Sequence, residues 1–345
     1  MKQNPGPRPS RRSVSAKHVA EAAGVSRTAV SRTFTPGASV SPATRAKVLA
    51  AAESLGYHVN HLARGLTRSE SGIVALIVAE LDTPFRARLL AALTDRLQAA
   101  GKVAMLINTD RSDESVEGAL RQAMSYRTDA AIVLSGRPDA SLGTLCARNG
   151  LRLILINRDE EFPHALHVRL DDVACGQRAF RILRESGCVK SALATSLSAT
   201  TSLRLRAKGF VDAARAASVP VVEQAIGETS YATGRELGIA LFSAEHPPDG
   251  VFCTTDLMAC GLVDVARGQF GLRIPEDLSV IGFDDIQQAS WENYRLTTFS
   301  QPIDRMCEAC VSWLDETAVG GDAISLEASL VLRDTVGLHP ANEVT

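Results

Sequence analysis

Residues 19–32 read VAEAAGVSRTAVSR, a stretch with the composition and spacing of a helix-turn-helix motif. The small side chain of Ala20 lets two helices approach closely, and Gly24 supplies the tight turn between them. Val25 and Val30 fill the small core that the two helices share. The stretch therefore predicts two short helices packed around a turn.

Serine residues mark where the helices of this region begin. Ser15 can cap a helix over residues 16–23, and Ser26 can cap a second helix from residue 27 to about residue 34. Ser41 followed by proline opens a third helix, which runs to residue 55. No strand pattern interrupts the three, so the region is predicted to be a small all-α domain.

The second of these helices has a polar exposed face. An arginine there can bond a guanine through two hydrogen bonds, and a threonine offers a hydroxyl and a methyl group to thymine. Serine hydroxyls at the same surface are suited to phosphate, which positions the protein without specifying sequence. The alternative is an ordinary three-helix module with a basic surface. The contacts expected with double-stranded DNA come from Ser15, Ser26, Arg27, Thr28, Ser31 and Arg32.

Charge is divided unevenly along the chain. Residues 1–70 hold eleven Lys or Arg against three Glu, a net charge of +8, whereas the remainder carries 26 basic and 36 acidic residues. A basic head on an acidic body indicates a polyanionic partner for the head alone. A solvated basic tail would give the same asymmetry, so charge does not decide between the two.

After residue 71 apolar runs alternate with amphipathic stretches. Such continuous apolar strands with helical crossovers predict buried parallel sheets in an α/β architecture. About 270 residues are more than an α/β domain with a single sheet usually contains. We therefore expect two lobes with a ligand crevice at the carboxyl ends of the strands. The predicted strands are residues 73–78, 103–107, 130–134, 151–156, 191–194, 251–253 and 279–282, and the clearest helices are residues 86–100, 114–125 and 140–149.

Several classes of protein are disfavoured by what the sequence holds. Seven scattered cysteines do not resemble a disulfide framework, and Cys307 and Cys310 lie in a helical run where burial is the usual reason for them. The first residues are not a signal peptide, and no apolar run is long enough to span a membrane. We therefore expect a cytoplasmic protein without a metal site.

The sequence lacks the common motifs of several enzyme classes. The sequence holds no phosphate-binding loop of the G-x-x-x-x-G-K-[ST] type, no G-x-G-x-x-G after a strand and no G-x-S-x-G elbow. Acidic pairs such as Asp284 and Asp285 lack an accompanying nucleophile or cofactor. The prediction is a protein that is not an enzyme and needs no cofactor.

Four blocks in order give the N-terminal region a specific resemblance. They are residues 19–32, VSPATRAKV at 40–48, LGY at 55–57 and NHLARGL at 60–66. This series resembles the lactose-repressor (LacI/GalR) family of bacterial transcriptional regulators. The resemblance implies a helix-turn-helix head that binds operator DNA.

The last block resembles the hinge helix of that family, which folds only on operator DNA. A seven-residue helix carrying a glycine is too short to be stable alone, which agrees with this behaviour. The leucine at position 66 would enter the minor groove as an apolar wedge. Val59 stands where the family often has proline. Contacts implied for the hinge come from Asn60, Ala63, Arg64 and Leu66.

The resemblance extends through the body. The blocks are DTPF at 82–85, LDD at 170–172, RLRAKGF at 204–210, TTD at 254–256, and VIGFDD at 280–285 followed by LTT and QP. They imply a two-lobed, periplasmic-binding-protein-like body with an effector between its lobes. Carboxylates and an arginine suit the hydroxyls of a sugar, and aromatic rings suit its apolar face. The effector contacts implied are Phe85, Asp171, Arg206, Thr255, Asp284 and Trp291.

Two of these assignments leave alternatives open. Arg206 and Asp284 would equally form a structural ion pair that bridges the lobes. Thr255 stands where the family often has asparagine, which leaves the identity of the ligand open, and cleft arginines would also suit an acid.

The predicted organisation has four parts. Residues 1–13 form a basic arm, 14–58 the helix-turn-helix domain, 59–70 the hinge helix and linker, and 71–345 the body. Lobe N covers about 71–187 and 300–325, and lobe C about 188–299 and 326–340.

The predicted function is that of a homodimeric repressor whose affinity for operator DNA is controlled by a small, sugar-like effector. A ligand-dependent activator or a corepressor-dependent regulator needs the same parts with the opposite sign. A solute-binding protein without a DNA role would not carry the basic head.

Overall fold

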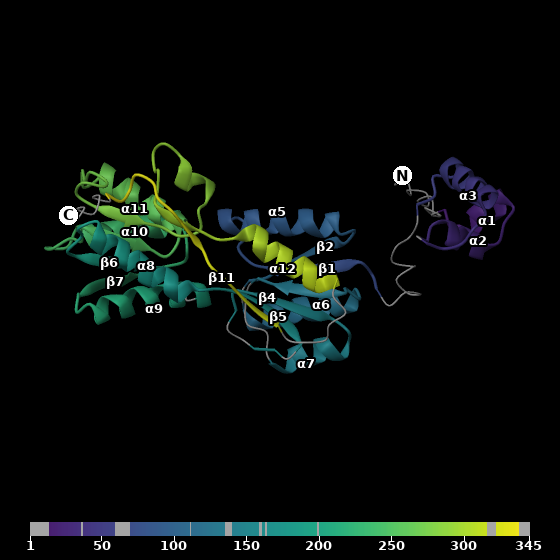
Figure 1. Cartoon of the computed structure of the whole chain (residues 1–345), viewed down its shortest axis with the longest axis horizontal. Helices are drawn as coiled ribbons and strands as arrows, with labels where there is room; N and C mark the ends of the chain where they lie inside the picture. The colour runs from purple at the N-terminus through teal and green to yellow at the C-terminus, as the bar shows by residue number, and fades with distance from the viewer. Residues whose placement is uncertain are drawn as a thin grey trace, which may run out of the picture. The chain divides into compact units, whose positions relative to one another are not determined.

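Two separate units make up the chain, divided between Ser71 and Gly72. We refer to them as the head and the body, and Figure 1 shows the elements of both. This computed structural model describes residues 14–35, 37–58, 70–110, 112–134, 140–158, 161–162, 164–198, 200–315 and 322–337. No helix within those ranges is long and apolar enough to cross a membrane.

The head is a three-helix domain, made of α1 (Ala16–Ala23), α2 (Arg27–Thr33) and α3 (Pro42–Ser54). Gly24 ends α1 with a φ of 63°, a left-handed conformation that glycine adopts without strain. The Oγ atom of Ser26 accepts the backbone N–H of Ala29 and so caps α2. The three helices agree with the predicted ones to within a residue or two, and their shared core consists of Val19, Ala20, Val30, Val48, Ala51 and Ala52.

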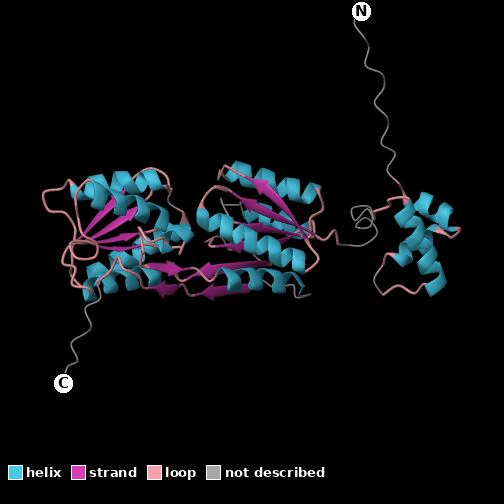
Figure 2. Cartoon of the chain, turned by 90° about the horizontal axis from the view of Figure 1, so that it is seen from above, coloured by secondary structure: helices cyan, strands magenta, loops and turns pink. Residues whose placement is uncertain are grey.

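The first lobe of the body is built on a parallel six-stranded sheet of order β11-β5-β4-β3-β1-β2. Helices α5 and α12 pack together on one face of the sheet, and α6 and α7 contact the other face. Figure 2 shows helices on both faces of the sheet in each lobe. The strands are β1 (Ile73–Val78), β2 (Val103–Asn108), β3 (Ala130–Val133), β4 (Arg152–Ile156), β5 (Ala165–Leu170) and β11 (Asp322–Leu326). The helices are α5 (Pro84–Ala99), α6 (Asp113–Ser125), α7 (Ala140–Arg148) and α12 (Ile303–Asp315).

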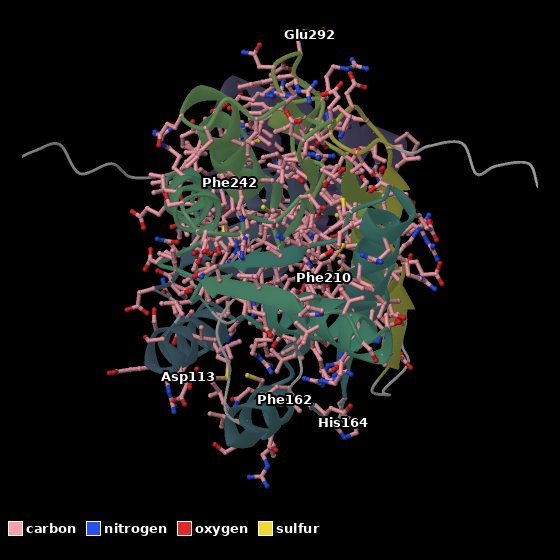
Figure 3. All side chains as sticks on the ribbon, turned by 90° about the vertical axis from the view of Figure 1, so that its left-hand side faces the viewer. Asp113, Phe162, His164, Phe210, Phe242 and Glu292 are labelled. Atoms are coloured by element: carbon pink, nitrogen blue, oxygen red, sulfur yellow. The ribbon has the colours of Figure 1, made fainter. Side chains whose placement is uncertain are left out.

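The second lobe has a parallel four-stranded sheet of order β7-β6-β8-β9. Helices α8 and α9 pack on one face, and α10 and α11 on the other (Figure 1). Phe210 of α9 is fully buried, stacks on Phe252 of β8 and lies in the interior in Figure 3. The strands are β6 (Ser191–Thr195), β7 (Val221–Ala225), β8 (Gly250–Cys253) and β9 (Ser279–Ile281), and the helices are α8 (Asp172–Glu185), α9 (Thr201–Ala216), α10 (Tyr231–Phe242) and α11 (Asp256–Gly268).

The chain passes between the lobes three times. It leaves the first lobe where β5 gives way to α8, and it returns between β10 (Thr298–Ser300) and α12. It leaves again after β11 to form β12 (Ser329–Val331), which pairs antiparallel with β10. The first crossing differs from the predicted boundary near residue 187, because α8 packs on α9 and β8 of the second lobe. An amphipathic helix at a crossing fits either sheet, so its sequence did not show which one it covers.

Two pairs of glycines hold the helices of the second lobe close together. A Cβ atom at Gly176 of α8 would lie 2.1 Å from the carbonyl oxygen of Arg206, and one at Gly209 of α9 would lie 2.1 Å from that of Val173. Gly234 and Gly261 play the same part between α10 and α11. Only glycine permits these approaches, so the α8–α9 pair also fixes the position of Arg206.

The described residues hold no group of three His, Cys, Asp or Glu side chains that would bind a metal ion. Cys307 and Cys310 are both buried on α12, as their helical pattern predicted.

Candidate functional site

A cavity of about 120 Å³ lies between the two lobes of the body. Its walls come from both lobes and from the crossing segment at Gln301. The first lobe contributes Glu80, Thr83, Pro84, Phe85, Arg86, Leu89, Leu134, Ile156, Asn157 and Arg158. The second lobe contributes Thr200, Ser202, Leu203, Arg206, Thr229, Thr255, Leu257, Asp284 and Ile286.

The topology of the two sheets explains why these residues meet. Leu134 follows β3, Asn157 follows β4, and Thr255 closely follows β8. The carboxyl ends of parallel strands lie at one edge of a sheet, and that edge is where ligands bind in open α/β sheets. The cavity therefore occupies the position that the fold provides for a ligand.

Arg206 is the centre of a buried network at this site. Its Nε donates to the Oδ1 of Asp172 at 2.8 Å, and its Nη1 donates to the carbonyl oxygen of Thr254 at 2.9 Å. The Nη1 atom lies 3.7 Å from the Oδ1 of Asp284, and the guanidinium covers the ring of Phe283 at 3.4 Å. Arg206 thus ties the first turn of α8 to the segments that follow β8 and β9.

The carboxylates of the network are buried with Arg206. Asp284 also accepts a 2.7 Å hydrogen bond from the side-chain amide of Gln301. Burial raises the pKa of Asp172, and the adjacent Arg206 opposes that shift. Burial likewise raises the pKa of Asp284 to about 6, against the opposing effects of Arg206 and Gln301.

The raised pKa of Asp284 predicts a pH dependence. Since its folded value lies above the reference value of 3.8, its favourable contribution to folding is present below about pH 4 and is lost as the pH rises through about 6. Asp284→Asn is neutral throughout and still offers an oxygen to Gln301. We therefore expect the melting temperature of Asp284→Asn, relative to the unsubstituted protein, to increase between about pH 4.5 and about pH 7. A difference that stays constant or decreases over that range would contradict this assignment.

Three polar atoms in the cavity walls lack partners. The Oδ1 of Asn157, the Oγ1 of Thr255 and the Oε1 of Gln301 are buried and make no hydrogen bond to any residue that the structure describes. Thr255 is 7% exposed and Gln301 5% exposed. Buried polar atoms are nearly always hydrogen-bonded, so these atoms indicate a polar ligand in the cavity.

Four of the six residues predicted for effector binding meet at this cavity. They are Phe85, Arg206, Thr255 and Asp284. Arg206 and Asp284 also form the interaction that the structural alternative foresaw, at 3.7 Å.

Asp171 and Trp291 do not line the cavity. Asp171 is exposed and caps α8 by accepting the backbone N–H of Ala174 at 2.9 Å. Trp291 follows the 3-10 helix η1 (Gln287–Ser290), is 49% exposed and stacks on Tyr294. Its neighbour Glu292 points outward at the edge of the molecule in Figure 3.

Other residues of the site were not predicted. Asp172, rather than Asp171, contacts Arg206, because the first residue after β5 serves as the helix cap and the second faces inward. Gln301 belongs to the QP block of the sequence, which could have identified it as a site residue. It directly follows the crossing strand β10. Glu80 and Arg86 form an ion pair at 3.6 Å in the opposite wall.

The head presents the predicted polar surface on α2. Arg27, Thr28, Ser31 and Arg32 are exposed, whereas Val30 on the same helix is buried in the core. Ser26 is exposed and caps the helix. Ser15 is half-buried at the start of α1, where its backbone N–H donates to the ring of His18. The hinge residues Asn60, Ala63, Arg64 and Leu66 lie outside the described residues.

Family models match both units of the chain. Residues 15–60 match the model described as bacterial regulatory proteins, lacI family. Residues 180–336 match the model of a periplasmic binding protein-like domain. The first match covers the helices of the head, and the second covers the second lobe and the returning crossings.

Relatives with regulatory names match over most of their length. The HTH-type transcriptional regulator DegA of Bacillus subtilis is 30% identical over 84% of this chain and 86% of its own length. The HTH-type transcriptional repressor PurR of Photobacterium profundum is 29% identical over 93% of this chain and 98% of its own length.

Solved structures match over nearly the whole chain. The lac repressor dimer bound to operator and the anti-inducer ONPF is 24% identical, covers 94% of this chain and 99% of its own, and gives a TM-score of 0.83. The transcriptional regulator CelR in complex with cellobiose is 26% identical over 93% of this chain and 99% of its own, with a TM-score of 0.66. The chain therefore belongs to the lacI family of bacterial regulatory proteins, as a DNA-binding transcriptional regulator with a helix-turn-helix head and a two-lobed, periplasmic-binding-protein-like body.

Proposed function

We propose that the protein is a repressor, that it binds operator DNA as a homodimer, and that a small sugar-like effector in the body cavity controls its affinity for the operator. One observation carries the control by a ligand: the three unpartnered polar atoms of Asn157, Thr255 and Gln301 line a cavity between two lobes. A ligand that satisfies atoms in both lobes favours one lobe arrangement over another, and this difference in affinity is what couples a ligand to a second site.

The names of relatives support the direction and the ligand class. PurR is named a repressor, and CelR was solved with cellobiose. A sugar has hydroxyl groups that donate to the oxygens of Asn157 and Gln301 and apolar ring faces that fit against Phe85. Control by a sugar needs only its reversible binding at the site and no chemical reaction. We therefore propose that the protein is not an enzyme. Because its operator is bacterial DNA, we place its action in the cytoplasm.

The DNA-binding role rests on α2 and on the hinge segment. We propose that Arg27 and Thr28 read base edges in the major groove, and that Ser15, Ser26, Ser31 and Arg32 contact the backbone. For the hinge we propose minor-groove contacts by Asn60, Ala63 and Arg64, with Leu66 as the wedge. Two heads in a dimer would read two halves of a roughly palindromic site.

Arg27→Ala tests the reading role. We expect it to relax the base preference at one position of each operator half and to weaken binding to the selected operator by about 1–3 kcal/mol. Selection from a randomised DNA library with both proteins measures the preference. Lys47→Ala, on α3, is the matched control for loss of a positive charge, and it should leave the selected sequence unchanged. An identical selected sequence for Arg27→Ala would remove Arg27 from base readout.

The direction of control is tested by adding ligand to the operator complex. A repressor released by its effector loses operator affinity when the cavity is filled. A gain in affinity instead would establish the corepressor or activator alternative.

A further inference from the structure

Three helices of the body begin at the cavity, and their first residues share an unusual feature. Thr83 precedes α5, Thr200 precedes α9 and Thr255 precedes α11, and all three line the cavity. None of these N-cap side chains makes a capping hydrogen bond. The amino ends of all three helices are therefore left without the usual side-chain oxygen.

Three other helices of the body do have a side-chain cap. The side chains of Ser112, Asp171 and Ser230 each accept a backbone N–H in the first turn of α6, α8 and α10. Acidic residues also stand in the first turns of α6 and α8, but not in those of α5 and α9. Helices α5, α9 and α11 thus lack the side-chain cap that α6, α8 and α10 have.

The starts of α9 and α11 are neighbours. Helix α9 follows β6 and α11 follows β8, and these two strands pair directly. The hydroxyls of Thr195 and Thr254, at the ends of those strands, lie 3.0 Å apart. Arg206 bonds the carbonyl of Thr254, which places its guanidinium beside the start of α11.

A further observation indicates a ligand at this position. The Oγ1 of Thr255 is buried without a hydrogen-bond partner among the described residues. The carboxylate of Asp256, in the first turn of α11, is engaged with the backbone N–H of Ile286 and the hydroxyl of Thr298.

We propose that the effector carries an anionic group, a phosphate or a carboxylate, which binds at the N-termini of α9 and α11 beside Arg206. The positive end of the helix dipole and a guanidinium both favour negative charge. The acceptor oxygens of Asn157, Gln301 and Asp284 are suited to hydroxyl groups, so the ligand is a phosphorylated or carboxylated sugar. This inference rests on the proposed effector site and narrows its ligand class.

Inorganic phosphate is the first probe, used with the full-length protein. We expect phosphate to raise the melting temperature above that in sodium chloride of equal ionic strength, because a ligand that binds only the folded protein stabilises it. Thr200→Asp supplies a carboxylate cap at the start of α9 and repels an anion, so phosphate affinity should fall by about tenfold or more.

Ser112→Asp is the matched control. It places the same carboxylate at the start of α6, outside the cavity lining, where a side-chain cap already exists. It should keep the phosphate response of the unsubstituted protein. Phosphate that protects no better than chloride, or that protects Thr200→Asp equally well, would overturn the proposal.

Glucose, glucose 6-phosphate and gluconate distinguish the form of the anion. Tighter binding of the phosphate ester or of the sugar acid than of glucose supports the corresponding group, and tighter binding of glucose than of both would contradict the proposal. Operator selection with the same protein is independent of these titrations. Sequence-specific binding without a phosphate response would therefore reject the anion site and leave the regulator function standing.

Discussion

Replacing Arg206 with alanine is expected to lower the free energy of unfolding of the body by about 3–5 kcal/mol. Arg206 and Asp172 are both 3% exposed in their side chains and meet at 2.8 Å. Removing the guanidinium leaves Asp172 buried without its counterion and the carbonyl of Thr254 without its donor. A surface ion pair of the same length would contribute far less, because water would solvate the remaining charge.

A double-mutant cycle separates the lost ion pair from the lost packing. Asp172→Asn combined with Arg206→Ala removes the uncompensated charge, so the double variant should be more stable than Arg206→Ala alone. Urea unfolding followed by tryptophan fluorescence measures all four proteins, since Trp291 and Trp313 lie in the body. If Arg206→Ala unfolds at the same urea concentration as the unsubstituted protein, Arg206 is not a structural centre of the cavity.

This expectation changes how loss of ligand response in Arg206→Ala must be interpreted. The side chain faces the cavity and also holds it together, so response and stability should be lost in the same variant. Thr255→Val offers a cleaner separation, because the Oγ1 of Thr255 has no partner among the described residues.

Gly209→Ala is expected to destabilise the body by about 1–3 kcal/mol through overpacking at the α8–α9 crossing. The added Cβ would lie 2.1 Å from the carbonyl oxygen of Val173, and backbone on a neighbouring helix yields only by moving that helix. Since α9 carries Arg206 and begins at Thr200, the shift should also weaken binding at the cavity.

Gly118→Ala is the matched control for this substitution. Gly118 lies within α6, is exposed, and has nothing within 4 Å of its added Cβ. Alanine there should stabilise the helix by about 0.5–1 kcal/mol. Urea midpoints that fall for Gly209→Ala and rise for Gly118→Ala support the close approach. An equal gain for both variants would show that α8 and α9 are not pressed together.

The sequence predicted best the elements that depend on local chemistry. The head helices begin after Ser15, Ser26 and Ser41, because a serine before a helix satisfies amide groups that the helix cannot. Strands such as β1 and β3 are buried on both faces, and their unbroken apolar runs made them recognisable.

Strands with polar residues were missed. Strand β5 contains His167 and Arg169, and β7 is an edge strand with exposed Glu223. Neither gives a continuous apolar run or a full alternation. Their place in the sheets comes from pairing with distant strands, which no local pattern encodes.

The cavity was predicted only in part, because contacts between distant segments also determine which residues line it. The sequence blocks predicted Arg206, Thr255 and Asp284 as effector contacts, and the fold of the two sheets brings them together. Asp171 and Asp172 are adjacent acids, and only the course of the chain into α8 decides which one caps the helix and which one turns inward. Asn157 lies in the first lobe and Gln301 in a crossing segment, so their convergence depends on the complete fold.

We propose that a ligand in the body cavity controls how tightly the head binds its operator. The most direct measurement is the Kd for the selected operator, by fluorescence anisotropy, with and without the compound that protects the body most in the thermal titrations. The account predicts that this compound changes the operator Kd by about 5–150-fold in the unsubstituted protein and has little effect in Thr200→Asp. An unchanged Kd at a concentration that saturates the cavity would contradict it.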